Sequence, residues 1–138
     1  MSAESPTKVL KLDEKQSVQY AVPLWLRDEQ IKLATQRVKG RIQQVDDKRL
    51  EPIAIVGFGP SLRDTWEEIR RFTWIMTCSG SHKFLLERDI VPVWHVEVDP
   101  RSHKVELLGT PHPAVTYLPA STCHPEYFAH LEKHGAQV

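Results

Sequence analysis

The stretch from Ile53 to Leu62 reads Ile-Ala-Ile-Val-Gly-Phe-Gly-Pro-Ser-Leu. Its first four residues are apolar and mostly β-branched, a pattern that is typical of a buried strand. The Gly-x-Gly-Pro-Ser segment predicts a tight turn, and the amphipathic residues after it predict a helix. We expect Gly57 and Gly59 to allow close backbone approaches, and Ser61 to cap the helix. A loop of this kind, at the start of a helix, is shaped to hold phosphate.

The Gly-x-Gly pattern is weak evidence by itself. The dinucleotide fingerprint has a third glycine or alanine three positions on, where this chain has Leu62, so an ordinary NAD-type site is disfavoured. A tight turn without a ligand is the alternative interpretation. Because the loop directly follows a buried-looking strand, we favour a nucleotide-binding role for its residues. These are Gly57, Phe58, Gly59, Pro60 and Ser61.

Composition sets limits on the class of protein. The chain has 138 residues, 41% of them hydrophobic, which is enough to build one domain with its own core. Lys plus Arg equals Asp plus Glu at 18 each, so net charge gives no reason to expect nonspecific binding to nucleic acid or anionic membranes. There is no leader-like segment or membrane-spanning run, so we expect a cytoplasmic protein with Cys78 and Cys123 reduced.

Three regions follow one another along the chain. Residues 1–22 are polar and lack periodicity, which predicts an irregular arm. Residues 23–50 carry apolar residues at helical spacing, which predicts a long helix. Residues 51–138 alternate between strand-like and helix-like segments, which predicts a Rossmann-like, three-layer α/β domain with a mainly parallel sheet. The strands are expected at 53–56, 73–78, 93–98 and 114–118, and the helices at 62–71, 80–88, 102–108 and 125–134.

The last residues, from Gly135 to Val138, resemble the start of a further strand, so we expect the domain to be incomplete there. An unfinished parallel sheet exposes backbone hydrogen-bonding groups at its edge. Such an edge would be covered by more of the chain, by the N-terminal arm, or by a second copy in a homo-oligomer.

Polar residues follow each of the first three predicted strands, and the carboxyl ends of parallel strands meet at one edge, where ligands collect. Glu97 and Asp99 are two residues apart and so point the same way from a strand. Paired carboxylates can hold Mg²⁺ on a diphosphate, so both are candidate catalytic residues and metal ligands. The alternative interpretation is a solvated strand end in which Asp99 caps the following helix.

Two further groups lie at the same predicted edge. Cys78, Ser79 and Gly80 follow the second strand and offer nucleotide-binding donors, although Ser before a helix is ordinarily an N-cap. His124 follows the fourth strand and is a candidate catalytic base or phosphate donor, or else a loop residue bonded to the backbone.

A zinc site is a weaker hypothesis. Cys123, His124, His130 and His134 lie close in sequence, and the last two are spaced i, i+4 on a predicted helix. The chain lacks a His-Glu-x-x-His or Cys-x-x-Cys pattern, so histidines on a helix surface are the favoured interpretation.

From about Pro52 onward the sequence resembles the hydroxymethylpterin diphosphokinase-like domains, a family that includes flagellar motor accessory factors and bacterial and phage proteins. Four segments carry the resemblance: Val56-Gly-Phe-Gly-Pro-Ser-Leu62, Thr77-Cys-Ser-Gly-Ser81, Asp89-Ile-Val-Pro92 and Val98-Asp-Pro100. The resemblance implies a Rossmann-like fold that binds a nucleotide, with transfer of diphosphate from ATP to a pterin alcohol in one branch. The N-terminal helix is expected to lie outside it.

The diphosphokinase branch is expected to carry an Asp-x-Asp-Gly cluster, whereas this chain has Glu97-Val-Asp-Pro100 and is nearer the motor accessory branch. Bacterial sialyltransferases carry a similar Gly-x-Gly-Pro-Ser-Leu loop for a CMP-sugar. Three hypotheses follow. The chain is a Mg²⁺-dependent transferase that moves a diphosphate from ATP to an acceptor hydroxyl, a nucleotide-sugar-dependent glycosyltransferase acting on a small molecule or glycan, or a non-catalytic binding or assembly module.

Overall fold

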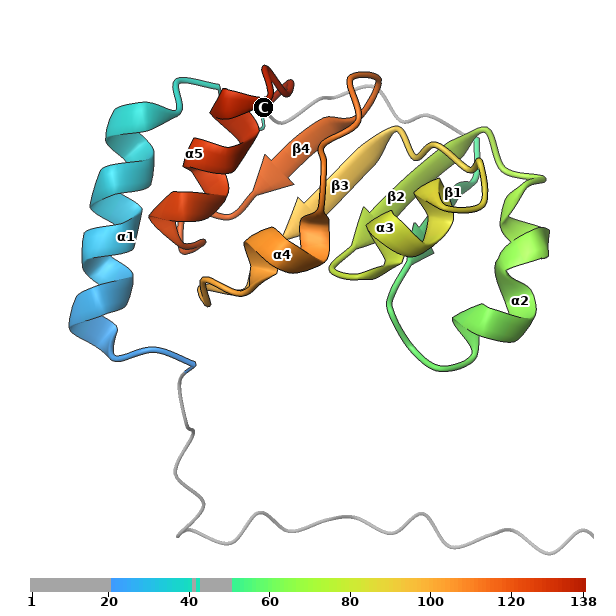
Figure 1. The fold of residues 1–138 in the computed structure, drawn as a ribbon, viewed down its shortest axis with the longest axis horizontal. Coiled ribbons are helices and arrows are strands. Elements are labelled where there is room, and N and C mark those ends of the chain that lie inside the picture. Colours follow the sequence, from blue (N-terminus) through green and yellow to red (C-terminus); the bar gives the residue numbers. More distant parts are fainter. Residues whose placement is uncertain (1–20, 41, 43–50) are drawn as a thin grey trace, which may run out of the picture.

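The computed structural model describes residues 21–40, 42 and 51–138. Most of the irregular arm that is expected at residues 1–22 therefore lies outside the described residues. The elements are α1 (Leu24–Arg37), β1 (Ile53–Val56), α2 (Leu62–Ile69), β2 (Trp74–Cys78), α3 (Ser81–Leu86), β3 (Trp94–Glu97), α4 (Lys104–Leu108), β4 (Thr116–Pro119) and α5 (Pro125–Lys133). The predicted α/β fold with a parallel sheet is confirmed, and each strand and helix expected after residue 51 is present (Figure 1).

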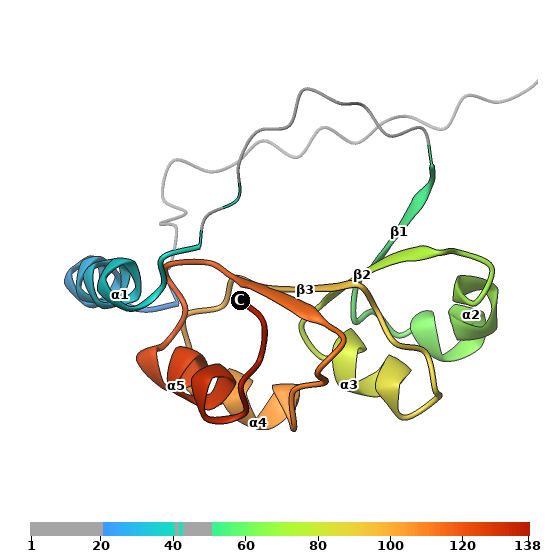
Figure 2. The ribbon, with the colours of Figure 1, turned by 90° about the horizontal axis from the view of Figure 1, so that it is seen from above.

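The sheet has four parallel strands in the order β1-β2-β3-β4, so strands that are consecutive in the chain are neighbours in space. Connections between parallel strands are right-handed, so when each strand pairs with the next one in the chain, every connecting helix lies on the same face of the sheet. Figure 2 accordingly shows α2, α3, α4 and α5 on one face of the sheet, with α1 beyond β4. All the strands therefore end at one edge, where the loops after β1, β2, β3 and β4 come together.

The face of the sheet under the helices holds two apolar clusters with a polar centre. One cluster lies over β1 and β2 and includes Val56 and Leu85, and the other lies over β4 and includes Tyr117 and Leu131. Between them lie Thr77 of β2 and His95 of β3, whose inward side chains are both buried. The middle of the core must therefore satisfy hydrogen bonds as well as bury apolar surface.

The other face of the sheet is apolar and partly exposed, and none of the described helices lies over it (Figure 2). Ile55 is 68% exposed, and Trp74 and Trp94 are half-buried and stack on each other with ring centroids 5.5 Å apart. The alternation of strand side chains explains the pattern, because every second residue points away from the helices.

The N-terminal helix is shorter than predicted. It ends at Arg37, Val38 has an extended backbone, and residues 38–40 and 42 are not helical, while 43–50 lie outside the described residues. Val38 packs against the β4 cluster in this extended conformation, and β-branched residues and the glycine at position 40 both disfavour a continuing helix. Helical periodicity in the sequence therefore overestimated the length of this element.

Two residues one turn apart hold α1 to the rest of the fold. Ala34 packs into the β4 cluster, and the Gln30 side-chain amide, buried four residues earlier, donates to the carbonyl of Pro100 at 3.2 Å. Arg37 adds a hydrogen bond to the Pro125 carbonyl at 2.9 Å. The helix is therefore part of the domain and lies beside α5.

At the further strand expected near the last residues, the structure has a single bridge to β4. Thr116 and Gln137 form a parallel bridge, and the Tyr117 amide donates to the Gln137 carbonyl at 2.8 Å.

Candidate functional site

The loop between β1 and α2 is closed by its own backbone. The Leu62 amide donates to the Gly59 carbonyl at 3.1 Å, and the Asp64 amide donates to the Ser61 carbonyl at 3.0 Å. Ser61 itself has a helical backbone, and its side chain makes no capping hydrogen bond. The expectation that Ser61 caps α2 through its hydroxyl is therefore wrong, because a side-chain cap needs an extended backbone at that residue.

Neither glycine of this loop is demanded by the fold. Gly57 and Gly59 do not have positive φ angles. A Cβ atom added to Gly57 would meet no atom within 4 Å, and one added to Gly59 would meet only Ser61 Oγ, at 4.0 Å. The close approach expected here is not made by the protein's own atoms, so the space above the loop is open to an external group.

Hollows flank the loop on both sides. One of about 310 Å³ lies between β1 and the start of α2, lined in part by Ile55, Gly57 and Thr65. The other, of about 250 Å³, is lined in part by Phe58 and Arg63. The loop therefore stands between two shallow, accessible spaces.

Gly80, after β2, is the glycine at this edge of the sheet that a side chain of the protein packs against closely. A Cβ atom on Gly80 would lie 2.7 Å from the ring of Phe58, closer than real contacts allow. The 59% exposed Phe58 ring thus rests on the loop after β2. The contact joins the two loops and covers Gly80, which sequence analysis assigned to ligand binding.

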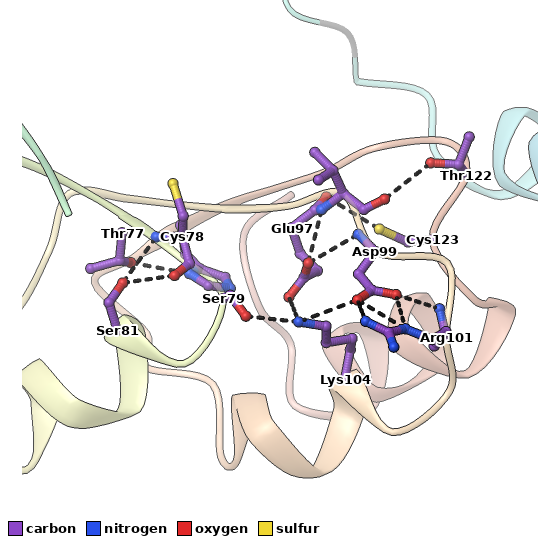
Figure 3. Close-up of polar contacts among 12 residues, drawn as sticks. Thr77, Cys78, Ser79, Ser81, Glu97, Asp99, Arg101, Lys104, Thr122 and Cys123 are labelled. Carbon is purple, nitrogen blue, oxygen red and sulfur yellow. Dashed lines mark hydrogen bonds and ion pairs between the residues drawn. The ribbon is translucent and has the colours of Figure 1, made fainter. Parts of the chain in front are cut away.

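Ser81 ties the ends of β1 and β2 together. Its buried Oγ lies 2.7 Å from the Val56 carbonyl. It also lies 2.8 Å from the Cys78 carbonyl and accepts from the Cys78 amide at 3.1 Å (Figure 3). The Cys78 side chain alternates with the buried Thr77 and so lies on the opposite face of the sheet. Both cysteines are free thiols, as expected.

Replacing Ser81 by Ala is expected to lower the free energy of unfolding by about 1–3 kcal/mol, because buried backbone groups lose their partner. Urea unfolding followed by circular dichroism measures this loss. The matched control is Ser61→Ala, which removes an exposed hydroxyl that makes no capping bond and should change stability by less than about 0.5 kcal/mol. Equal effects of the two substitutions would show that Ser81 does not tie the strands.

The end of β3 and the loop after it bring Glu97 and Asp99 to one place, with a lysine between them. Glu97 Oε1 accepts from the amides of Val98 and Asp99, at 3.0 Å each. Lys104 Nζ lies 3.7 Å from Glu97 Oε2 and 3.5 Å from Asp99 Oδ2, and donates to Ser79 Oγ at 2.7 Å (Figure 3). The loops after β2 and β3 are therefore joined through the Lys104 ammonium.

Asp99 is held in its charged form by Arg101. The guanidinium binds both carboxylate oxygens, with Nε 2.8 Å from Oδ1, and the Arg101 amide also donates to Oδ1 at 3.0 Å. These hydrogen bonds, with a smaller contribution from the Lys104 charge, hold the pKa of Asp99 well below its usual range despite partial burial. Asp99 is therefore a poor proton acceptor at neutral pH.

Lys104 and Arg101 were not among the site residues that the sequence predicted. The signal available was two cations two and five residues after Asp99, at the start of a predicted helix. A lysine in such a helix usually faces water. Here Lys104 is buried, with its side chain 10% exposed, because it starts α4 directly beside the ends of β2 and β3.

A family model described as 6-hydroxymethylpterin diphosphokinase MptE-like matches residues 28–137. The chain belongs to the MptE-like family. The match begins inside α1, so the expectation that the N-terminal helix lies outside the resemblance is wrong, in keeping with the packing of Ala34 in the domain core. No curated protein and no solved structure matches the chain. Among the described residues of this MptE-like protein, no helix is long and apolar enough to cross a membrane.

His124 sits at the start of α5 in this MptE-like chain. Its Nδ1 accepts from the Glu126 amide at 3.3 Å and lies 3.8 Å from the Glu126 carboxylate. In the neutral ring the proton is then on Nε2, which makes that atom a donor. This geometry suits the phosphate-donor alternative better than the base, and both roles remain predictions.

The zinc hypothesis is wrong for the part of the chain that the structure describes, where no group of three or more His, Cys, Asp or Glu residues could hold a metal. Instead, Cys123 Sγ donates to the Glu97 carbonyl at 3.2 Å. His130 Nε2 pairs with the Gly109 carbonyl at 2.7 Å, and His134 Nδ1 with the His130 carbonyl at 2.9 Å. These side chains bind backbone oxygens, which explains their positions without a metal.

The Glu97 and Asp99 carboxylates also fit Mg²⁺ poorly as arranged. Mg²⁺ needs carboxylate oxygens within about 2.1 Å in octahedral geometry. One oxygen of Glu97 is taken by two amides, both Asp99 oxygens are bound by Arg101, and Lys104 lies between the carboxylates. Mg²⁺ binding by these residues of the MptE-like domain remains a prediction that requires the lysine to leave.

Proposed function

We propose that this MptE-like protein is a nucleotide-binding transferase that moves a diphosphate from ATP to an acceptor hydroxyl. The observation that carries the proposal is the open space at Gly57 and Gly59, glycines that neither backbone angle nor internal packing explains. A phosphate group lying against the backbone of this loop would explain why both positions are glycine. The family match supports a diphosphokinase-like or related transferase.

In this proposal the chain acts by positioning and charge neutralisation. The acceptor oxygen bonds to the β-phosphorus of ATP while the bond from that phosphorus to the α,β-bridging oxygen breaks. AMP leaves with the bridging oxygen, and the proton of the acceptor hydroxyl passes to water. The ammonium of Lys104 and the exposed guanidinium of Arg101 stand at the same edge of the sheet as the glycine loop and would bind phosphate oxygens. Asp99, which stays charged, would orient Arg101 rather than accept the hydroxyl proton.

Nucleotide-sugar-dependent glycosyl transfer is a second candidate. It is favoured by the segment Glu97-Val-Asp-Pro100, which departs from the pattern expected of diphosphokinases, and by the poor fit of its carboxylates to a divalent ion. The same glycine loop would then hold the diphosphate or phosphate of the sugar nucleotide.

Calorimetric titration of the protein with ATP, GTP, CTP, a UDP-sugar and a CMP-sugar separates these functions. We expect ATP to bind, and phosphorus NMR with 6-hydroxymethylpterin as the first acceptor to show AMP appearing together with a new diphosphate ester. Binding and cleavage of a nucleotide sugar alone would favour glycosyl transfer, and binding without any transfer would favour a non-catalytic module. Failure of all five ligands to bind would overturn the nucleotide site itself.

A further inference from the structure

Lys104 is a buried cation held at the centre of the carboxyl edge of the sheet. It is the first residue of α4, and its ammonium reaches across to Ser79 on the neighbouring loop (Figure 3). Ser79 has a left-handed backbone, with φ of 57°, a conformation that non-glycine residues seldom adopt. The loop after β2 thus takes an unfavourable conformation at the residue whose hydroxyl fixes the lysine.

The charges of the cluster are already balanced. Glu97 and Asp99 contribute two negative charges, Lys104 and Arg101 contribute two positive charges, and the side chains of Glu97 and Lys104 are only 5% and 10% exposed. A divalent ion placed between the carboxylates would lie close to the ammonium where water screens poorly. The ion and the ammonium therefore compete for one position.

We propose that Lys104 is the resident cation of the Glu97 and Asp99 pair, so that this edge binds an anionic ligand directly, without a divalent ion between the carboxylates. The inference rests on the proposed function only for the class of ligand, a phosphate-bearing one.

The distances around the ammonium leave it able to bind a ligand. An ammonium has three N–H donors, and the one aimed at Ser79 makes a short bond of 2.7 Å. The carboxylate oxygens, at 3.5 and 3.7 Å, are farther than the roughly 2.7–2.9 Å of a strong charge-assisted hydrogen bond. A phosphate oxygen that approached the ammonium would therefore gain a donor without first breaking a tight ion pair.

Titration of the protein with Mn²⁺, with the free ion followed by electron paramagnetic resonance, tests the inference without any nucleotide. The wild-type chain should bind Mn²⁺ only weakly, and Lys104→Met should bind it at least about tenfold more tightly, since an ammonium no longer repels the ion. Arg101→Met is the matched control. It changes the net charge of the cluster by the same amount but leaves the ammonium between the carboxylates, so its affinity for Mn²⁺ should stay like that of wild type.

Tight Mn²⁺ binding by the wild-type chain that Asp99→Asn abolishes would overturn the inference, as would equal Mn²⁺ binding by Lys104→Met and Arg101→Met. Lys104→Gln serves as a second variant if Lys104→Met fails to fold, as judged by circular dichroism, and the wild-type titration decides if neither folds. ATP titration in EDTA and in Mg²⁺ should give affinities within about threefold of each other. Absence of ATP binding in both would sink the proposed function while the Mn²⁺ result still stood.

Discussion

Acidification from pH 7 to pH 4 is expected to destabilise this protein strongly, because two histidines are buried in the middle of its core. His82 on α3 and His95 on β3 are 0% and 1% exposed, and their rings lie 4.5 Å apart. Their Nδ1 atoms lie 3.4 and 3.0 Å from Thr77 Oγ1, and His82 Nε2 lies 3.0 Å from the hydroxyl of Tyr117.

These contacts form one consistent network when both rings are neutral. The Tyr117 hydroxyl accepts from the His112 amide at 2.7 Å and donates to His82 Nε2. The Nδ1–H groups of His82 and His95 then donate to Thr77, whose hydroxyl donates to the Trp94 carbonyl. A proton added to His82 Nε2 would point at the Tyr117 hydroxyl proton that Nε2 accepts in the neutral network. The hydroxyl would have to turn away and lose its buried acceptor, so protonation breaks the network.

The direction of the pH effect follows from the pKa values. Burial lowers the pKa of His82 to about 4, with a further contribution from His112, and lowers the pKa of His95 to about 3, with further contributions from His82 and Lys104. The unfolded chain binds these protons near pH 6.5 and the folded chain does not. The stabilisation from the neutral rings is therefore fully present above pH 6.5, and it is lost as the pH falls toward the folded-state pKa values of about 4 and about 3. At about 1.4 kcal/mol per pKa unit, the two rings remove on the order of 5 kcal/mol by pH 4. That is comparable with the stability of a whole domain, about 5–15 kcal/mol.

Urea unfolding at pH 7, 6, 5 and 4 measures this slope. His95→Gln keeps an amide donor for Thr77 but cannot titrate, and should lose roughly half of the pH dependence. His103→Gln removes an exposed histidine and should leave the slope unchanged. A wild-type free energy of unfolding that is flat between pH 7 and pH 4, or a slope that His103→Gln reduces as much as His95→Gln does, would contradict this account of the core.

Replacing Gly57 and Gly59 together by Ala is expected to separate ligand binding from stability. The two methyl groups would enter open space, so the fold should tolerate them, and reduced freedom of the unfolded chain should raise stability by about 0.4–1 kcal/mol per site. The same methyl groups would occupy the space proposed for phosphate. We expect the affinity for ATP, measured by calorimetry, to fall by about a hundredfold or more, equivalent to about 2.7 kcal/mol.

Gly135→Ala is the control with the opposite pattern. Gly135 follows α5 with φ of 61°, where alanine is strained, so this variant should lose stability by about 1 kcal/mol and keep its affinity for ATP. Loss of stability without loss of affinity in the double glycine variant would remove the loop from the binding site.

The sequence was enough to predict the strands and helices after residue 51, because short β-branched runs and intervening amphipathic segments are local signals. The end of α1 was not predictable in this way. Its periodicity continues past Arg37, and only the packing of Val38 against a distant part of the chain shows where the helix stops.

The sequence predicts that the candidate residues meet at one edge of the sheet, but it does not predict the contacts that they make there. The sequence predicts that Gly57 and Gly59 allow close backbone approaches and that Ser61 caps the helix. In the structure the close packing falls on Gly80 and the tie between strands on Ser81. Both depend on the loop after β1 meeting the loop after β2, a contact between segments more than 20 residues apart that periodicity and turn chemistry cannot reveal. The burial of Lys104 has the same origin.

Amide chemical shifts of the ¹⁵N-labelled protein, recorded while ATP is added, locate the ligand most directly. We expect the largest changes at Gly57, Gly59, Ser79 and Lys104, since a nucleotide held by the glycine loop would reach across the carboxyl edge of the sheet. Changes confined to the hollow of about 500 Å³ beside β4, lined in part by Val38 and Leu118, would contradict the proposed site.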